Sequence, residues 1–130
     1  MAESEAKKYF ALIVEDTEDL ANMMVMILES MGLETHHCNN GMKALTYLET
    51  HTPDVMMLDI GMPGMTGWEV LEHLKVKYGT VPFPIIILTA FSDPANKLVG
   101  KLQEAVFRYL TKPFEASTVT NTVREALGIH

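Results

Sequence analysis

The sequence predicts an α/β fold in which a single open, mostly parallel five-stranded sheet carries helices on both faces. Short apolar runs rich in β-branched or aromatic residues alternate along the chain with longer stretches of helical spacing. Parallel strands need helical crossovers, and the helices then bury both faces of the sheet. The alternation therefore indicates a doubly wound arrangement.

Five segments are candidate strands. Three are strongly apolar and too short for a typical helix, at residues 9–14, 55–58 and 84–88. Two more polar segments, 34–38 and 107–110, are expected nearer the edges of the sheet. Cys38, which closes the second segment, is expected to be a small buried strand residue.

Five stretches of helical spacing lie between and after these strands. Their apolar stripes are Leu20, Met24, Ile27 and Met31; Ala44, Leu45 and Leu48; Leu71, Leu74 and Tyr78; Leu98 and Leu102; and Val119, Val123 and Leu127. The boundary signals are a capping box at Thr66 and Glu69, a cap with a first-turn proline at Asp93 and Pro94, and terminal glycines at Gly32 and Gly128.

Length and composition indicate the number of domains and exclude some kinds of protein. With 130 residues and no repeat or linker, the chain is expected to form one domain over 1–130, with a core from about 8 to 128. A net charge of -7 argues against direct nucleic-acid binding. A single cysteine, the absence of an apolar signal core and the lack of any run near 18 apolar residues favour a cytoplasmic protein without a membrane span.

Acidic residues stand at the ends of two predicted strands. Glu15 and Asp16 follow the first strand, and Asp59 ends the third. In a parallel sheet these ends meet at one edge, where two carboxylates about 4 Å apart repel by roughly 4 kcal/mol at an effective dielectric near 20. A hard divalent cation would offset this repulsion, which predicts a site for Mg²⁺ or Mn²⁺.

Two further groups are expected at the same edge. Thr89 closes the fourth strand with a hydroxyl, and Lys112 follows the last strand with an ammonium group. Together with the acids they suit phosphoryl transfer to a carboxylate, in which a metal and a lysine neutralise the phosphoryl oxygens. Asp59, alone at its strand end, is the predicted nucleophile, and Thr89 can donate a hydrogen bond to the phosphoryl group.

At four places the sequence resembles the receiver domain of two-component response regulators. The matching segments are 14–16 (Val-Glu-Asp), 58–67 (Leu-Asp-Ile-Gly-Met-Pro-Gly-Met-Thr-Gly), 88–90 (Leu-Thr-Ala) and 109–114 (Tyr-Leu-Thr-Lys-Pro-Phe). Each segment alone is weak, whereas their order and spacing together are specific. The resemblance extends from Tyr9 to Leu127 and implies a flavodoxin-like sheet with strand order 2-1-3-4-5.

The resemblance also implies roles for the residues of the acidic edge. Asp59 corresponds to the phosphoacceptor, Glu15 and Asp16 to the metal-side acids, and Lys112 to the phosphate-binding lysine. The backbone carbonyl of Gly61 corresponds to a further metal ligand. The phosphoryl donor would be a sensor histidine kinase or a histidine phosphotransfer protein, and the output an unknown downstream protein or effector domain.

A switch and an output face are implied in the same way. Thr89 and Tyr109 resemble a pair in which the hydroxyl moves toward the phosphoryl group and the ring turns inward. The bond from Lys112 to Pro113 corresponds to a cis peptide. The output face would comprise the fourth helix, the last strand and the fifth helix, around Phe91, Lys97, Leu98 and Tyr109. Residues 102–108 lack the glycine turn common in the family, so the end of the fourth helix is not predicted.

Three other functions are weighed against this switch, which is not expected to be a conventional enzyme. A degenerate receiver would act as an interaction module without phosphorylation, but the acid, hydroxyl and lysine set is intact. An aspartyl-phosphate hydrolase usually needs a second acid two residues after the nucleophile, where this chain has Gly61. A flavin carrier needs a phosphate loop after the first strand, where residues 15–19 are largely acidic.

The histidines, the methionines and the single tryptophan are expected to have structural roles. The five histidines show no zinc-ligand spacing with a cysteine and are expected at surface or structural positions. The ten methionines, including Met23 and Met26, are interpreted as core packing. Trp68, in the first turn of the third helix, is expected to be half exposed.

Overall fold

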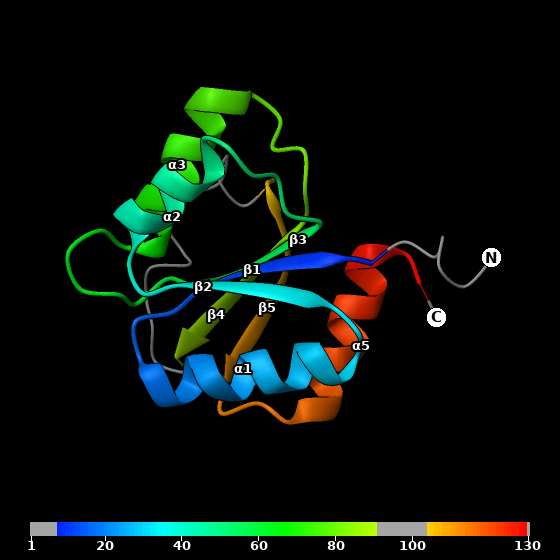
Figure 1. Cartoon of the computed structure of the whole chain (residues 1–130). Helices are drawn as coiled ribbons and strands as arrows, with labels where there is room; N and C mark the ends of the chain where they lie inside the picture. Colours follow the sequence, from blue (N-terminus) through cyan, green and yellow to red (C-terminus); the bar gives the residue numbers. More distant parts are fainter. Residues whose placement is uncertain (1–7, 91–103, 130) are drawn as a thin grey trace.

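A computed structural model describes residues 8–90 and 104–129 and contains a single parallel sheet in this part of the chain. Its strands are β1 (Phe10–Val14), β2 (Glu34–Cys38), β3 (Val55–Asp59), β4 (Ile85–Ala90) and β5 (Val106–Lys112). They lie in the order β2-β1-β3-β4-β5, and every neighbouring pair is parallel (Figure 1). The predicted fold class and strand order are confirmed.

Helices cover both faces of this sheet. Those described are α1 (Glu18–Ser30), α2 (Gly41–Leu48), α3 (Gly67–Tyr78) and α5 (Ala116–Leu127). Helices α2 and α3 lie together on one face, whereas α1 and α5 lie on the other (Figure 1). The predicted helix with Leu98 and Leu102, its Asp93 and Pro94 start, and Phe91 and Lys97 of the expected output face lie outside the described residues.

Each face of the sheet has its own apolar core. On the α2 and α3 face, Leu12, Met56, Leu58 and Ile87 of the strands pack with Leu71 of α3. On the other face, strand residues pack with the inward side chains of α1 and α5, which are Met24, Leu28, Val119 and Val123. Alternate strand residues point to opposite faces, and helices cover both faces, so the central strands are apolar throughout. Their packing fixes the position of the carboxyl ends of the strands.

Several helix boundaries match the sequence signals. Thr66 caps α3 in a reciprocal capping box with Glu69, as predicted. Helix α5 ends at Gly128, whose φ of 70° and ψ of 30° place it in the left-handed region that favours glycine. Both boundaries therefore follow from local residue chemistry.

Strand β5 is longer than the sequence predicts. The apolar run covers 107–110, whereas the strand extends from Val106 to Lys112 because its backbone pairing with β4 continues to the partners Ala90 and Lys112. Backbone hydrogen bonds do not require apolar side chains, so hydropathy alone does not mark the end of the strand.

One packing prediction is wrong, and a second is confirmed only in part. Trp68 is buried rather than half exposed, because the first turn of α3 lies directly against the end of β3 and turns the indole into the core. Met24, Met56, Met57 and Met62 are buried in the core as predicted, whereas Met23, Met26 and Met42 are exposed. Helix α1 turns Ala21, Met24 and Leu28 toward the sheet, which leaves Met23 and Met26 on its outer side.

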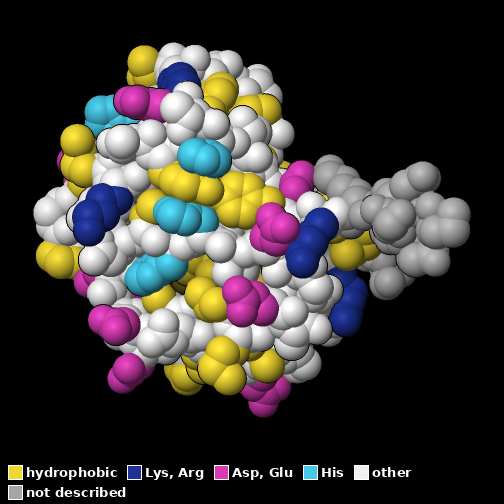
Figure 2. Space-filling view, in the orientation of Figure 1, with side chains coloured by type: hydrophobic (Ala, Val, Ile, Leu, Met, Phe, Trp, Pro, Cys, Tyr) yellow, Lys and Arg dark blue, Asp and Glu magenta, His cyan; other side chains and the backbone are white. Residues whose placement is uncertain are grey.

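The histidines that the structure describes on β2 and near the end of α2 have structural contacts. His36 and His51 stack on opposite sides of Tyr47, with ring centroids 3.9 and 4.0 Å from that of the tyrosine. Histidine side chains gather beside apolar ones on the face of the molecule seen in Figure 2. Cys38 is buried, as predicted. No helix within the described ranges is long and apolar enough to cross a membrane.

Candidate functional site

Three carboxylates meet at the carboxyl end of the sheet. Strand β1 pairs with β3 so that Val14 lies beside Leu58, and the residues that follow, Glu15 and Asp59, therefore emerge together. Asp16 comes from the same loop as Glu15. Ligand oxygens of the three acids lie within 4.8 Å of one another, the one such metal-capable group in the part of the chain that the structure describes. The structure thus brings together the acids that the sequence predicts.

Asp59 is held in a defined orientation at this edge. Its side chain is buried, and Oδ1 accepts a hydrogen bond from the backbone N–H of Gly61 at 2.9 Å. The other oxygen, Oδ2, lies 3.4 Å from Nζ of Lys112. One oxygen is therefore bound to the backbone of the following loop, while the other faces the lysine.

Glu15 is buried and is positioned through both its backbone and its side chain. Its carbonyl accepts a hydrogen bond from Nε2 of His37 at 2.7 Å, and its Oε2 accepts one from the N–H of Thr17 at 3.1 Å. Burial raises the pKa of Glu15 to about 7; Asp59 also raises it, whereas the Thr17 hydrogen bond and Lys112 lower it.

The donor set fits a hard divalent cation. Oε1 of Glu15 is buried and accepts no hydrogen bond from the described residues, although Nζ of Lys112 lies 3.4 Å away. A buried carboxylate oxygen without a hydrogen bond is costly, and a cation would satisfy it. Mg²⁺ and Mn²⁺ prefer carboxylate and carbonyl oxygens, which are the groups that Glu15, Asp16 and Asp59 offer.

We expect metal affinity to fall as the pH falls through 7. Below this value Glu15 holds a proton that a cation must displace, so the apparent Mg²⁺ affinity should drop about tenfold between pH 8 and pH 6. Isothermal titration calorimetry at several pH values measures this change. In Glu15→Gln, which has no such proton, the affinity should be lower overall and vary less with pH; an unchanged slope would contradict the assignment.

Without metal, Glu15 should make the protein less stable as the pH rises, whereas an ordinary ion-paired acid makes a protein more stable. The folded state holds the Glu15 proton up to about pH 7, whereas the ordinary pKa of a glutamate carboxyl is 4.5. The folded state therefore binds more protons between these values, and the contribution of Glu15 to the free energy of unfolding falls as pH rises through this window.

The remaining predicted groups lie at the same edge. Lys112, at the end of β5, forms ion pairs of 3.4 Å with both Glu15 and Asp59, and the peptide bond from Lys112 to Pro113 is cis, as the resemblance implied. Thr89 is buried, and its hydroxyl donates a hydrogen bond to the carbonyl of Ala90 at 3.1 Å. Tyr109 is 38% exposed, and partial burial raises the pKa of its phenol.

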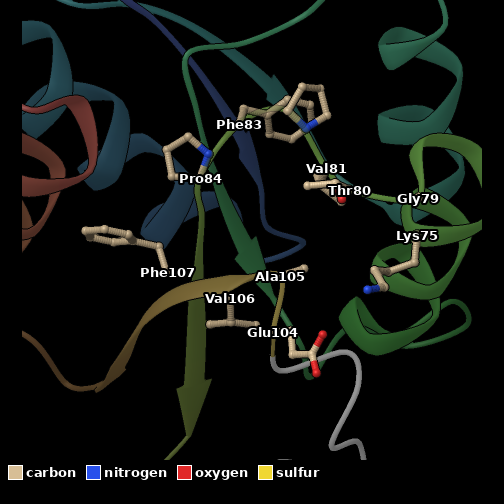
Figure 3. Close-up of a pocket in the computed structure, with 11 residues that line it drawn as sticks. Lys75, Gly79, Thr80, Val81, Phe83, Pro84, Glu104, Ala105, Val106 and Phe107 are labelled. Carbon is tan, nitrogen blue, oxygen red and sulfur yellow. The ribbon is translucent and has the colours of Figure 1, made fainter.

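A cavity of about 490 Å³ lies elsewhere. It is formed at the amino ends of β4 and β5, next to the end of α3, and its lining includes Lys75, Phe83, Glu104 and Phe107 (Figure 3). This is the opposite end of the strands from Asp59, and the cavity contains no cluster of carboxylates. The acidic edge, and not this cavity, is therefore the candidate functional site.

Three residues that support this edge were not predicted to do so. His37 binds the Glu15 carbonyl, Trp68 is buried in the core on the α2 and α3 face, and Gly67 packs against the backbone of Asp59. No sequence signal identifies the contact of His37, because it depends on the register between β1 and β2. The matched segment 58–67 does end in Gly67, but it does not reveal what the glycine touches.

A family profile and the curated relatives point to the same family. The profile described as "Response regulator receiver domain" matches residues 11–124. The DNA-binding response regulator MtrA of Mycobacterium tuberculosis (strain ATCC 25618 / H37Rv) is 34% identical over 116 residues, which are 89% of this chain and 49% of MtrA. This chain spans about half the length of the curated relatives that head the comparison.

Solved structures agree over nearly the whole chain. A putative response regulator from Chloroflexus aurantiacus superposes with a TM-score of 0.83 at 30% identity, covering 94% of this chain and 99% of the other. The receiver domain of a signal transduction histidine kinase from Syntrophus aciditrophicus gives a TM-score of 0.82 at 32% identity, covering 92% and 90%.

Proposed function

The chain belongs to the response regulator receiver domain family, whose members are phosphoacceptor switches of two-component systems, and from this premise we propose that Asp59 is its phosphoacceptor. The observation that carries the proposal is the meeting of Glu15, Asp16 and Asp59 with the ammonium group of Lys112. Receiver domains of response regulators interact with histidine kinases. A histidine kinase or a histidine phosphotransfer protein is accordingly the proposed donor.

In the proposed reaction, a carboxylate oxygen of Asp59 attacks phosphorus in line as the bond from phosphorus to the donor histidine nitrogen breaks. The electron pair of that bond stays on the imidazole, and the product is a mixed anhydride at Asp59. Mg²⁺, when bound, would neutralise charge on the phosphoryl oxygens. Lys112 faces Oδ2 and supplies a second positive charge there, while the N–H of Gly61 orients Oδ1. The carbonyl of Gly61 would be a further ligand of the metal.

The proposed signal is a change of surface. Thr89 would turn its hydroxyl from the Ala90 carbonyl to a phosphoryl oxygen, and Tyr109 would move inward from its partly exposed position. The surface that changes would include β5 and α5, together with the helix expected between β4 and β5. We propose that this domain acts in the cytoplasm, regulates a downstream protein or effector domain, and assists its own phosphorylation without being a conventional enzyme.

Other chemistry is less well supported. A hydrolase would need an acid two residues after Asp59, and that residue is Gly61, which contributes only backbone groups. A degenerate receiver would not need a lysine paired with both Glu15 and Asp59 at 3.4 Å. The acidic loop after β1 would repel the phosphate of a flavin.

The direct test is incubation of the protein with acetyl phosphate and Mg²⁺, followed by intact mass measurement and mapping of the modified residue. We expect the mass of one phosphoryl group to be added at Asp59, and a chelator added beforehand to prevent it. Turnover of unrelated phosphate esters without stable modification would favour a hydrolase. Modification mapped to another residue would overturn the assignment of Asp59.

A further inference from the structure

Trp68 carries a buried hydrogen-bond donor that has no acceptor within the described ranges. The side chain is 8% exposed, and its Nε1 is buried without a hydrogen-bond partner there. An indole N–H that has lost water and gained no acceptor disfavours the conformation that contains it. A second conformation that supplied an acceptor would therefore be stabilised relative to the first.

The position of Trp68 connects the acidic edge to the aromatic residue of the proposed switch. Gly67, which precedes it, packs so closely on β3 that an added Cβ would lie 2.6 Å from the carbonyl oxygen of Asp59. On its other side, the Trp68 ring lies 6.5 Å from the Tyr109 ring, centroid to centroid, at an interplanar angle of 54°. Trp68 thus contacts the ring expected to move and is anchored beside the residue expected to react.

Tyr109 can provide the missing acceptor. Its phenol oxygen has lone pairs that accept a hydrogen bond, whereas the ring in its partly exposed position leaves Nε1 unsatisfied. Thr89, the other hydroxyl of the proposed switch, donates to the carbonyl of Ala90. An inward turn of Tyr109 would bring its ring further into the α2 and α3 face of the core, where Trp68 is packed.

We propose that Trp68 is a positioning residue for the switch, and that its indole N–H donates a hydrogen bond to the phenol oxygen of Tyr109 when this ring turns inward. This inference rests on the proposed function, since it requires occupation of Asp59 to move Tyr109. The hydrogen bond would stabilise the inward conformation of Tyr109 and not the outward one. Trp68 would thereby link the phosphorylation site to the surface formed by β5.

The first experiment uses the single tryptophan of the chain, which gives a single indole N–H signal in ¹H–¹⁵N NMR spectra. The full chain is titrated with Mg²⁺ and then with beryllofluoride, a stable mimic of the phosphoryl group on an aspartate. We expect the Trp68 signal to shift to lower field on addition of beryllofluoride, and Tyr109→Phe, which keeps the ring but lacks the oxygen, to remove most of that shift. An equal shift in Tyr109→Phe would overturn the proposal.

The second experiment measures coupling. Trp68→Phe keeps an aromatic ring without the donor, and we expect it to weaken beryllofluoride binding by about two- to tenfold, the equivalent of one hydrogen bond. In the Tyr109→Phe background the same change should have no further effect. Phe83→Leu, a buried aromatic substitution near the opposite end of β4, should leave binding unchanged and serves as the control. Equal losses in both backgrounds would show that Trp68 acts only through packing and would overturn the proposal.

Beryllofluoride binding distinguishes a failure of the proposed function of Asp59 from a failure of the proposed role of Trp68. If ¹⁹F NMR shows no beryllofluoride bound to the unmodified protein, the proposed function of Asp59 fails, and the role of Trp68 falls with it. If beryllofluoride binds and the Trp68 signal stays in place, the proposed function stands and only the role of Trp68 is overturned.

Discussion

Replacing Asp59 with asparagine is expected to abolish phosphorylation by acetyl phosphate and to stabilise the metal-free protein. The amide has nearly the same shape, and its oxygen can still accept the hydrogen bond from the N–H of Gly61 at 2.9 Å, so the loop should keep its conformation. An amide oxygen does not form the anhydride, however, and the added mass of one phosphoryl group should disappear completely.

The gain in stability follows from the charges at the site. Three carboxylates lie together with Lys112, and Asp59 contributes to the raised pKa of the buried Glu15. Neutralising residue 59 removes this repulsion at the cost of one partly exposed ion pair, while Lys112 keeps its pair with Glu15. We expect the free energy of unfolding to rise by about 1 to 2 kcal/mol without divalent cations.

Urea unfolding with and without Mg²⁺ separates these effects. Mg²⁺ should stabilise the unmodified protein and have little effect on Asp59→Asn, because one of the three acids of the site is gone. Asp19→Asn, in the first turn of α1, removes one negative charge outside the group and is the matched control. A loss of stability in metal-free Asp59→Asn would show that the ion pair with Lys112 outweighs the repulsion, contrary to the site described above.

The acidic edge could be predicted from sequence because its residues follow directly on apolar runs. A strand that stops at Asp59 and another that stops before Glu15 place both acids at one edge as soon as the strands are parallel and adjacent. The adjacency itself came from the resemblance, since hydropathy does not determine strand order. Thr89 and Lys112 follow the same logic on β4 and β5.

The residues behind this edge could not be predicted, because their environments depend on contacts between distant segments. Trp68 lies in the first turn of α3, where a large amphipathic side chain is often partly exposed, yet the close packing of α3 on β3 buries it. Met26 falls at a spacing compatible with a core position, but the rotation of α1 on the sheet leaves it 71% exposed. Periodicity thus identifies a helix more reliably than the residues at the margins of its buried stripe.

The substitution with the largest expected effect on folding is Gly67→Ala. An ideal Cβ at this position would lie 2.6 Å from the carbonyl oxygen of Asp59 and 2.6 Å from Cα of Ile60. Both are backbone atoms of the segment that carries Asp59, the proposed phosphoacceptor, and the N–H of Ile60 also donates a hydrogen bond to the Leu88 carbonyl of β4. Since neither atom can rotate away, the first turn of α3 must move, and we expect a loss of about 2 to 4 kcal/mol.

Gly41→Ala is the matched control, because Gly41 is also the first residue of a helix and is also buried. Its added Cβ would meet side chains, 2.7 Å from Cγ2 of Val70 and 2.9 Å from Sδ of Met65, of which the methionine can adjust. Both variants gain the same helix propensity from alanine, so the difference between them in urea unfolding isolates the backbone clash. A smaller loss for Gly67→Ala than for Gly41→Ala would show that α3 does not need this close approach to Asp59. If α3 does need it, Gly67→Ala should also weaken Mg²⁺ binding, because the displaced backbone is that of Asp59, one of the proposed metal ligands.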